Sequence, residues 1–300
     1  MTRTGRLFAV LVVLGLSACD STSQARTPSV PTGAPGSTVS VDLDGRPFRL
    51  HIPTGYVAGT KVPLVVALHG FTSNAAEAES YFKLTGESDR RGFLYAMPDG
   101  TRDSRGDQFW DATDACCGFY ADDVDDSGYL HRLIGAVKSA YSVDPDRVAF
   151  IGHSNGGFMA YRMACDHAAE ISAIVSLAGA MTDDPARCTP SRPVSVLQIH
   201  GTADATISFT GGANGTHPYP SAAAGLDVWR RVDGCGDAPT SAAPLDLDSS
   251  LTGAETTVTS YRTGCRAGTR VELWAIAGGG HVPALTAHFP TRVVDFLLSR

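Results

Sequence analysis

A glycine-rich turn that follows an apolar strand constrains this chain more than any other feature. Residues 147–151 read Arg-Val-Ala-Phe-Ile and predict a buried strand, and residues 152–157 read Gly-His-Ser-Asn-Gly-Gly. A strand that enters a Gly-x-Ser-x-Gly turn and leaves it as a helix presents its serine at the tip of a strained bend. Glycines on both sides let the backbone pass there without a Cβ clash. The pattern predicts that Ser154 is an exposed nucleophile, and the alternative is an ordinary strand–glycine–helix connection.

A nucleophilic serine needs a histidine base and a carboxylate, and later strands supply both. Residues 193–199 predict a buried strand that ends shortly before Asp204, and residues 270–276 predict another that ends before His281. Hydrolases with this serine turn carry the acid and then the histidine after later strands, in that chain order. The sequence therefore predicts a catalytic triad of Ser154, Asp204 and His281.

Three other residues compete for these roles and fit less well. Asp99 follows the predicted strand 93–97 but precedes the serine, which breaks the chain order. His200 is adjacent to its strand and is expected to hydrogen-bond locally. His288 falls in the C-terminal helical stretch, where a solvated or packed histidine is expected.

An upstream strand predicts a site for the negative charge that develops during acyl transfer. Residues 63–68 form an apolar run that leads into His69-Gly70-Phe71, where the glycine permits a tight turn. The N–H groups of Phe71 and Asn155 are then expected to point at one spot and form an oxyanion hole. The alternative for the first of these segments is a plain turn after a strand.

Four aromatic residues on or near the same loops are candidates for a substrate pocket. They are Phe71, Trp110, Phe158 and Tyr219. Taken singly, each of these side chains fits a hydrophobic core as well as it fits a substrate platform.

One domain of about 260 residues is expected from about residue 38 to residue 300. Residues 39–53 predict a hairpin that turns at Asp44-Gly45. Beyond it, apolar strand-like runs alternate with helical stretches such as residues 125–141. This alternation is typical of a mostly parallel sheet with helices on both faces.

Several spaced motifs together resemble one family of secreted serine esterases. They are Leu68-His69-Gly70, Met97-Pro98-Asp99-Gly100-Thr101, Trp110 with Cys116-Cys117-Gly118, Val124-Asp125-Asp126, residues 143–148 and 152–157, His200 to Asp204, and Gly278 to Pro283. Over about residues 40–300 the chain resembles the poly(3-hydroxybutyrate) depolymerase-like and feruloyl-esterase-like family, which includes actinobacterial envelope lipoproteins. The resemblance implies an α/β-hydrolase fold and a serine carboxylester hydrolase that uses no metal or other cofactor. Its substrates would be polyhydroxyalkanoate-type, feruloyl or acetyl esters.

One departure weakens any inference about an aromatic acyl group. The family often has an aromatic residue after its final histidine, whereas His281 is followed here by Val282. Two other functions remain open beside the esterase. They are a serine peptidase, which would be expected to carry a further gating domain, and a catalytically silent envelope binding protein, which has no physical need for all three triad residues.

The amino terminus predicts export and a lipid anchor. Arg3 and Arg6 precede an apolar stretch, residues 7–16, that is too short to span a bilayer. Residues 16–19 read Leu-Ser-Ala-Cys and resemble a bacterial lipobox, so residues 1–18 are expected to be a signal peptide and Cys19 the lipidated residue. Residues 19–37, rich in Ser, Thr, Pro and Gly, are expected to form a disordered tether. The alternative is an ordinary secretory signal.

Charge limits the partners that this chain can have. The formal net charge is −7, and loss of Arg3 and Arg6 with the signal peptide leaves −7 − 2 = −9. No basic patch remains to follow phosphates, so nucleic acid is not expected as a partner. We expect a monomer that meets the membrane only through its lipid and binds a small or polymeric ester. The acidic pairs at residues 122–123 and 125–126 precede a helical stretch and are expected to cap it rather than bind a cation.

Six cysteines remain once Cys19 is set aside, and an even number in an exported chain suggests three disulfides. Four of them fall near the sheet edge opposite the active site, before a strand or after a helix. We therefore expect Cys165–Cys188 and Cys235–Cys265. Cys116 and Cys117 fall in a loop on the active-site side, about 18 Å from the other four, beyond disulfide reach. They are left as a vicinal disulfide or as two free thiols.

Overall fold

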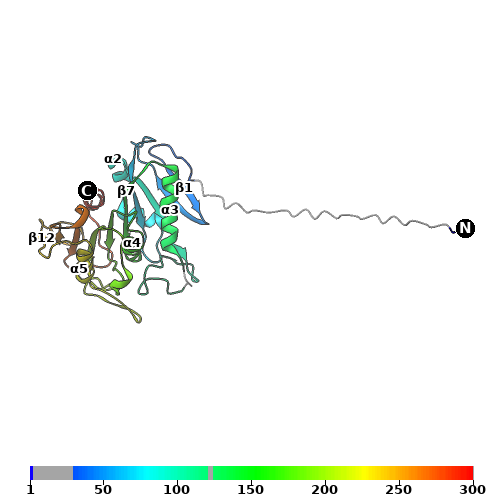
Figure 1. The fold of residues 1–300 in the computed structure, drawn as a ribbon. Helices are drawn as coiled ribbons and strands as arrows, with labels where there is room; N and C mark the ends of the chain where they lie inside the picture. Colours follow the sequence, from blue (N-terminus) through cyan, green and yellow to red (C-terminus); the bar gives the residue numbers. More distant parts are fainter. Residues whose placement is uncertain (3–29, 121–123, 300) are drawn as a thin grey trace.

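A large twisted sheet carries helices on both of its faces (Figure 1). The computed structural model describes residues 1–2, 30–120 and 124–299. The strands of the main sheet are β1 (Thr38–Leu43), β2 (Arg46–His51), β3 (Val62–Leu68), β4 (Leu94–Pro98), β7 (Val143–His153), β8 (Ala173–Leu177), β9 (Ser195–Gly201), β12 (Thr240–Ser241), β13 (Thr256–Tyr261) and β14 (Val271–Ile276). They lie in the order β1-β2-β4-β3-β7-β8-β9-β14-β13-β12. The strands from β4 to β14 run parallel, and antiparallel strands flank them at both edges.

Helices divide between the two faces of this sheet. They are α1 (Ala75–Phe82), α2 (Thr85–Arg91), α3 (Asp126–Ala140), α4 (Asn155–Asp166), α5 (Ala222–Val232) and α6 (Phe289–Leu298), with short 3-10 turns at Pro185–Arg187 and Arg266–Gly268. Buried side chains of α3, α4 and α5 belong to one core cluster, and those of α1 and α6 belong to the other. Two small hairpins, β5 (Thr101–Arg102) with β6 (Gln108–Phe109) and β10 (Gly212–Asn214) with β11 (His217–Tyr219), lie outside the main sheet.

Strand β3 shows how the sequence builds two cores from one sheet. Its residues are apolar without interruption, because both faces of a central parallel strand are covered. Leu64, Val66 and Leu68 enter the cluster under α3 and α4, whereas Val65 and Ala67 enter the cluster under α1 and α6. The alternate placement follows from the two-residue period of a strand. The expected fold class is confirmed.

The predicted turn and the predicted helix cap are also present. Asp44 and Gly45 join β1 to β2 with φ of 57° and 78°, the left-handed conformations that a two-residue hairpin turn requires. Asp125 caps α3 by accepting a hydrogen bond from Gly128 N at 2.7 Å. Asp126 departs from the expectation, because its buried carboxylate pairs with Arg46 at 2.6 Å. Asp122 and Asp123 lie outside the described residues.

The predicted tether ends earlier than residue 37. Val30 is buried in the main core, Pro31 O accepts a hydrogen bond from the Tyr141 hydroxyl at 2.9 Å, and that hydroxyl accepts one from Gly33 N at 2.8 Å. Apolar and hydrogen-bonding groups therefore hold residues 30–37 against the end of α3. The signal peptide, Cys19 and the rest of the tether lie outside the described residues. Within the described part of the chain, no helix has both the length and the apolar character to cross a bilayer.

Disulfides join the cysteines as the topology predicts. Cys165, near the end of α4, pairs with Cys188 shortly before β9, and Cys235 pairs with Cys265. Cys116 and Cys117 form the vicinal disulfide rather than two free thiols. The Cys235–Cys265 link closes the segment that contributes β12 and β13, which is the edge of the sheet beside β14.

We expect removal of the Cys235–Cys265 disulfide to destabilise the fold. The two cysteines are 30 residues apart, and a loop of this length is expected to stabilise the fold by about 3–4 kcal/mol by reducing the entropy of the unfolded chain. Measured stabilisation by disulfides is often smaller than this estimate. Cys235→Ser with Cys265→Ser should therefore lower the free energy of unfolding by about 2–4 kcal/mol, measured by urea denaturation. The parent protein in excess reductant should show a loss of at least this size. Equal stability of the double variant and the oxidised parent would contradict this role.

Candidate active site

Ser154 lies at the sharp bend between β7 and α4. Its backbone has φ 53° and ψ −120°, and its N–H donates to Leu177 O on the neighbouring strand β8 at 2.8 Å. A Cβ at Gly152 would overlap the carbonyl group of Gly156, and a Cβ at Gly156 would overlap the carbonyl of Leu68. The bend therefore requires glycine at both positions, because three backbone segments meet there.

The three residues predicted as a triad meet at this bend. His281 Nε2 lies 2.9 Å from Ser154 Oγ, and His281 Nδ1 lies 2.8 Å from Asp204 Oδ2. They follow β7, β9 and β14, which lie close together in the sheet with only β8 between the first two. The parallel strands end at the same edge, so residues far apart in the sequence come within hydrogen-bond reach.

Asp204 is held as a buried carboxylate. Its Oδ1 accepts hydrogen bonds from Thr206 N at 2.8 Å and Ile207 N at 2.9 Å. Burial alone would raise the pKa of Asp204, but hydrogen bonds from His200, His281 and Ile207 N outweigh burial and hold it well below the usual range. An ionised Asp204 favours the tautomer of His281 with its proton on Nδ1, which leaves Nε2 free to accept the serine proton.

Two of the three competing residues have structural roles instead. His200 accepts from Gln198 Nε2 at 3.0 Å through Nδ1 and donates to Ile207 O at 2.8 Å through Nε2, so it bonds locally as predicted. Asp99 Oδ1 accepts from Ala75 N at 2.8 Å and so holds the start of α1. His200 Nε2 also lies 3.3 Å from Asp204 Oδ2, so this ring supports the acid, and His281 is the histidine that lies beside Ser154.

The loop after β3 contacts the serine bend. A Cβ at Gly70 would lie 3.2 Å from His153 Nδ1 and 3.5 Å from Ser154 Cβ. Phe71 follows at once and lines the cleft beside the serine. Asn155 is the first residue of α4, where N–H groups have no acceptor within the helix. The two expected oxyanion donors thus belong to segments that touch each other at Ser154.

Hydrogen bonds of the Asn155 side chain hold the first residue of α4 in place. This side chain is fully buried, its Oδ1 accepts from Trp110 N at 2.7 Å, and its Nδ2 donates to Trp110 O at 2.7 Å. Nδ2 also lies 3.4 Å from Cys116 Sγ of the vicinal disulfide. The loop between β6 and α3 is therefore bonded directly to the residue that follows Ser154.

Two histidines that sequence reasoning did not assign support the site. His69 Nδ1 donates to Gly70 O at 2.7 Å and its Nε2 accepts from Gly100 N at 2.8 Å, and burial lowers its pKa. His153 Nε2 donates to His281 O at 2.9 Å, and burial lowers the pKa of His153 to about 4. Both rings are therefore neutral at pH 7 and hold backbone beside the serine. Their adjacency in the sequence to Gly70 and Ser154 is the signal that could have identified them.

A cavity of about 350 Å³ opens beside Ser154 and His281. Its apolar lining is Phe71, Ala78, Tyr81, Phe82 and Val282, and its polar lining includes Ser73 and Glu77. Four of the lining side chains, Glu77, Ala78, Tyr81 and Phe82, come from α1, which no motif identified. Val282 is 63% exposed and stands at the rim.

Three of the four predicted pocket aromatics belong to the core instead. Trp110 and Phe158 have no exposed surface and Tyr219 has only 6%. Trp110 Nε1 donates to His69 O at 3.1 Å, and the Phe158 and Tyr219 rings contact each other edge to face at 6.2 Å. The prediction was wrong for these three because Phe158 lies on a buried face of α4 itself, and Trp110 and Tyr219 pack inward against that helix. Of the four predicted aromatics, only Phe71 lines the cavity.

Comparison with known proteins identifies the family. The family model described as "Putative esterase" matches residues 44–229. The "Putative esterase NocK" of Nocardia uniformis subsp. tsuyamanensis is 29% identical over 233 residues, which cover 70% of this chain and 66% of that protein. "Feruloyl esterase B" of Piromyces equi is 26% identical over 244 residues, covering 79% of this chain and 42% of that protein. The chain thus spans just under two thirds of the first relative and less than half of the second.

A solved structure shares the fold. The "Acetyl xylan esterase from Aspergillus awamori" superposes with a TM-score of 0.63 over 87% of this chain and 99% of that one, at 15% sequence identity. At this identity the likeness concerns the α/β-hydrolase architecture alone. Since the family model covers more than half of the sequence, this chain belongs to the putative esterase family.

Proposed function

We propose that this protein is a serine carboxylester hydrolase that works through an acyl-enzyme. The observation that carries the proposal is the continuous hydrogen-bond chain from Ser154 Oγ through His281 to Asp204, at 2.9 Å and 2.8 Å. A carboxylate that fixes one histidine tautomer next to a serine hydroxyl is the arrangement that nucleophilic acyl transfer requires.

The reaction proceeds in two halves. His281 Nε2 takes the proton of Ser154 as the hydroxyl attacks the ester carbonyl, and Asp204 stabilises the imidazolium that forms. The N–H groups of Phe71 and Asn155 receive the negative oxygen of the tetrahedral intermediate. His281 then protonates the leaving alcohol, and a water molecule releases the acid from Ser154 by the same route.

The acyl or alcohol part of the substrate occupies the cavity between α1 and Val282. Phe71, Tyr81 and Phe82 give this cavity an apolar wall, which suits a feruloyl, acetyl or hydroxyalkanoyl group better than a charged one. Similar proteins named feruloyl esterase and acetyl xylan esterase support the first two classes. Rates of hydrolysis of methyl ferulate, acetylated xylan and hydroxybutyrate oligomers would rank the three.

The protein acts outside the cytoplasm, anchored by lipid at Cys19. Two features support this location: the sequence of residues 1–19, which predicts an export signal and resembles a lipobox, and the three disulfides, which persist in oxidising compartments. Mass spectrometry of the N-terminal peptide of the mature protein would test the anchor.

Ser154→Ala should abolish ester hydrolysis and leave stability unchanged. The hydroxyl forms the new bond, and loss of a triad serine typically costs several orders of magnitude in kcat. The assay is turnover of a short-chain nitrophenyl ester, with the thermal midpoint as the control for folding. More than a few per cent of parent kcat, or phosphonate labelling that survives the substitution, would exclude Ser154 as the nucleophile.

Asp204→Asn and Asp99→Asn should separate the orienting acid from its competitor. The amide at residue 204 favours the wrong tautomer of His281, so kcat should fall by about 10³–10⁴ with little change in KM. Asn at residue 99 still accepts from Ala75 N, so its kcat should remain within about threefold of the parent. The opposite ranking of the two variants would place the acid at Asp99.

His153 makes stability depend on pH. The pKa of His153 is about 4 in the folded protein and 6.5 in the unfolded chain. Between pH 4 and pH 6.5 the unfolded chain therefore binds a proton at this residue and the folded protein does not. Stability is lost as the pH falls from 6.5 to 4, by up to about 3 kcal/mol. His153→Gln keeps a donor for His281 O and should flatten this dependence in urea titrations at pH 7 and 4.5. An equally steep loss in the variant would show that other groups cause it.

A further inference from the structure

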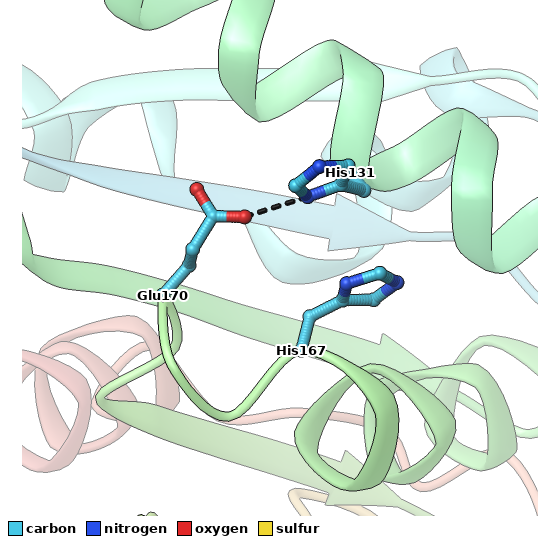
Figure 2. A group of neighbouring side chains, drawn as sticks. All are labelled: His131, His167 and Glu170. Carbon is cyan, nitrogen blue, oxygen red and sulfur yellow. Dashed lines mark ion pairs between the residues drawn. The ribbon is translucent and has the colours of Figure 1, made fainter. Parts of the chain in front are cut away.

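Two histidines and a glutamate gather at the end of α4 that is far from Ser154. His131 lies on α3, His167 follows α4 directly, and Glu170 lies in the connection to β8 (Figure 2). One ring nitrogen from each histidine and one carboxylate oxygen all lie within 4.8 Å of one another. The two rings stack nearly parallel, with centroids 4.8 Å apart and an interplanar angle of 7°.

The surroundings of His167 leave one of its nitrogens without a proton. Ser127 Oγ lies 2.8 Å from Asp166 Oδ2 and 3.0 Å from His167 Nε2. The serine has a single proton, which goes to the carboxylate as the stronger acceptor, so Nε2–H of His167 donates to Ser127 Oγ. Nδ1 then carries a lone pair.

Glu170 offers a charged oxygen to the same space. Its carboxylate lies between the ammonium group of Lys138 and the ring of His131. Lys138 Nζ binds Oε2 at 2.6 Å, which leaves Oε1 directed at His131 Nδ1, also at 2.6 Å. One oxygen is thus anchored and the other faces the histidines.

We propose that His131, His167 and Glu170 form a binding site for a divalent transition-metal ion of the Zn²⁺ type. Two imidazole nitrogens and one carboxylate oxygen are a donor set that Zn²⁺ prefers, with water as the fourth ligand. The hydrogen bond from His167 Nε2 to Ser127 is the outer contact that orients a metal-binding histidine.

Binding requires a small movement of His131. Ligand atoms around tetrahedral Zn²⁺ lie about 3.3 Å apart, given metal–ligand distances of about 2.0–2.1 Å. The His131 side chain is 52% exposed and can turn out of its stack to close this distance. Nδ1 of this ring can bind a metal when the single ring proton lies on Nε2.

The proposed site is structural, since it joins α3, the end of α4 and the connection to β8. Helix α4 has 12 residues and separates the site from Ser154 by about 18 Å. A metal there cannot touch an ester held at the serine. It would instead hold the far end of the helix whose first turn supplies Asn155.

Calorimetric titration of the full, untagged chain with Zn²⁺ tests the proposal. We expect one ion per chain with a Kd in the micromolar range or tighter, and a rise in the thermal midpoint of about 5 °C at 100-fold excess over Kd. His131→Ala and the isosteric Glu170→Gln should each weaken binding at least tenfold. His217→Ala, which removes an exposed histidine on β11, should leave the Kd unchanged.

One competing location can be tested with the same measurement. His153 and His281 lie with ring centroids 5.1 Å apart beside Asp204 and are a second place where the ion could bind. His281→Ala should leave Zn²⁺ binding unchanged. Loss of binding in this variant with retention in Glu170→Gln, or the absence of binding at about 1 mM Zn²⁺, would overturn the proposal. Either result leaves the esterase assignment intact, because that assignment depends on Ser154.

Discussion

The left-handed backbone of Ser154 is the constraint on which the site depends. A serine at φ 53° is strained by about 1–3 kcal/mol and keeps this conformation only when the surrounding structure enforces it. Here the ends of β3 and β7 and the first turn of α4 touch through backbone atoms, because glycines leave no side chain between them. The bend raises the hydroxyl clear of the sheet, and the two expected oxyanion donors come from the segments that enforce it.

Much of the candidate active site could be predicted, because loops that follow parallel strands meet at one edge of the sheet. The segments before Ser154, Asp204 and His281 were short and mainly apolar, which indicates buried strands. Parallel strands carry their following loops to one edge, so the three side chains were expected to meet without any knowledge of distances. The four structural cysteines were predicted by the same reasoning at the opposite edge.

The cavity could not be predicted in this way, because it depends on packing rather than on order. Tyr81 and Phe82 enter it from α1, a short helix whose sequence resembles any amphipathic surface helix. Trp110 was expected there because it falls in a loop on the correct side of the sheet. Its backbone instead bonds the buried Asn155 side chain, and the ring turns inward. Whether an aromatic side chain on a loop faces a cavity or the core depends on contacts with residues far away in the sequence. Such contacts leave no repeating pattern in the sequence from which they could be predicted.

The pairing of every cysteine in residues 30–120 and 124–299 has a chemical consequence. This part of the folded chain presents no thiol to maleimides, iodoacetamide or oxidants, so covalent chemistry at a soft nucleophile has nowhere to occur within it. A cysteine introduced at the cavity rim, for example in place of Val282, would be the single reactive sulfur among these residues. A dye attached there would report events beside the serine from one defined position.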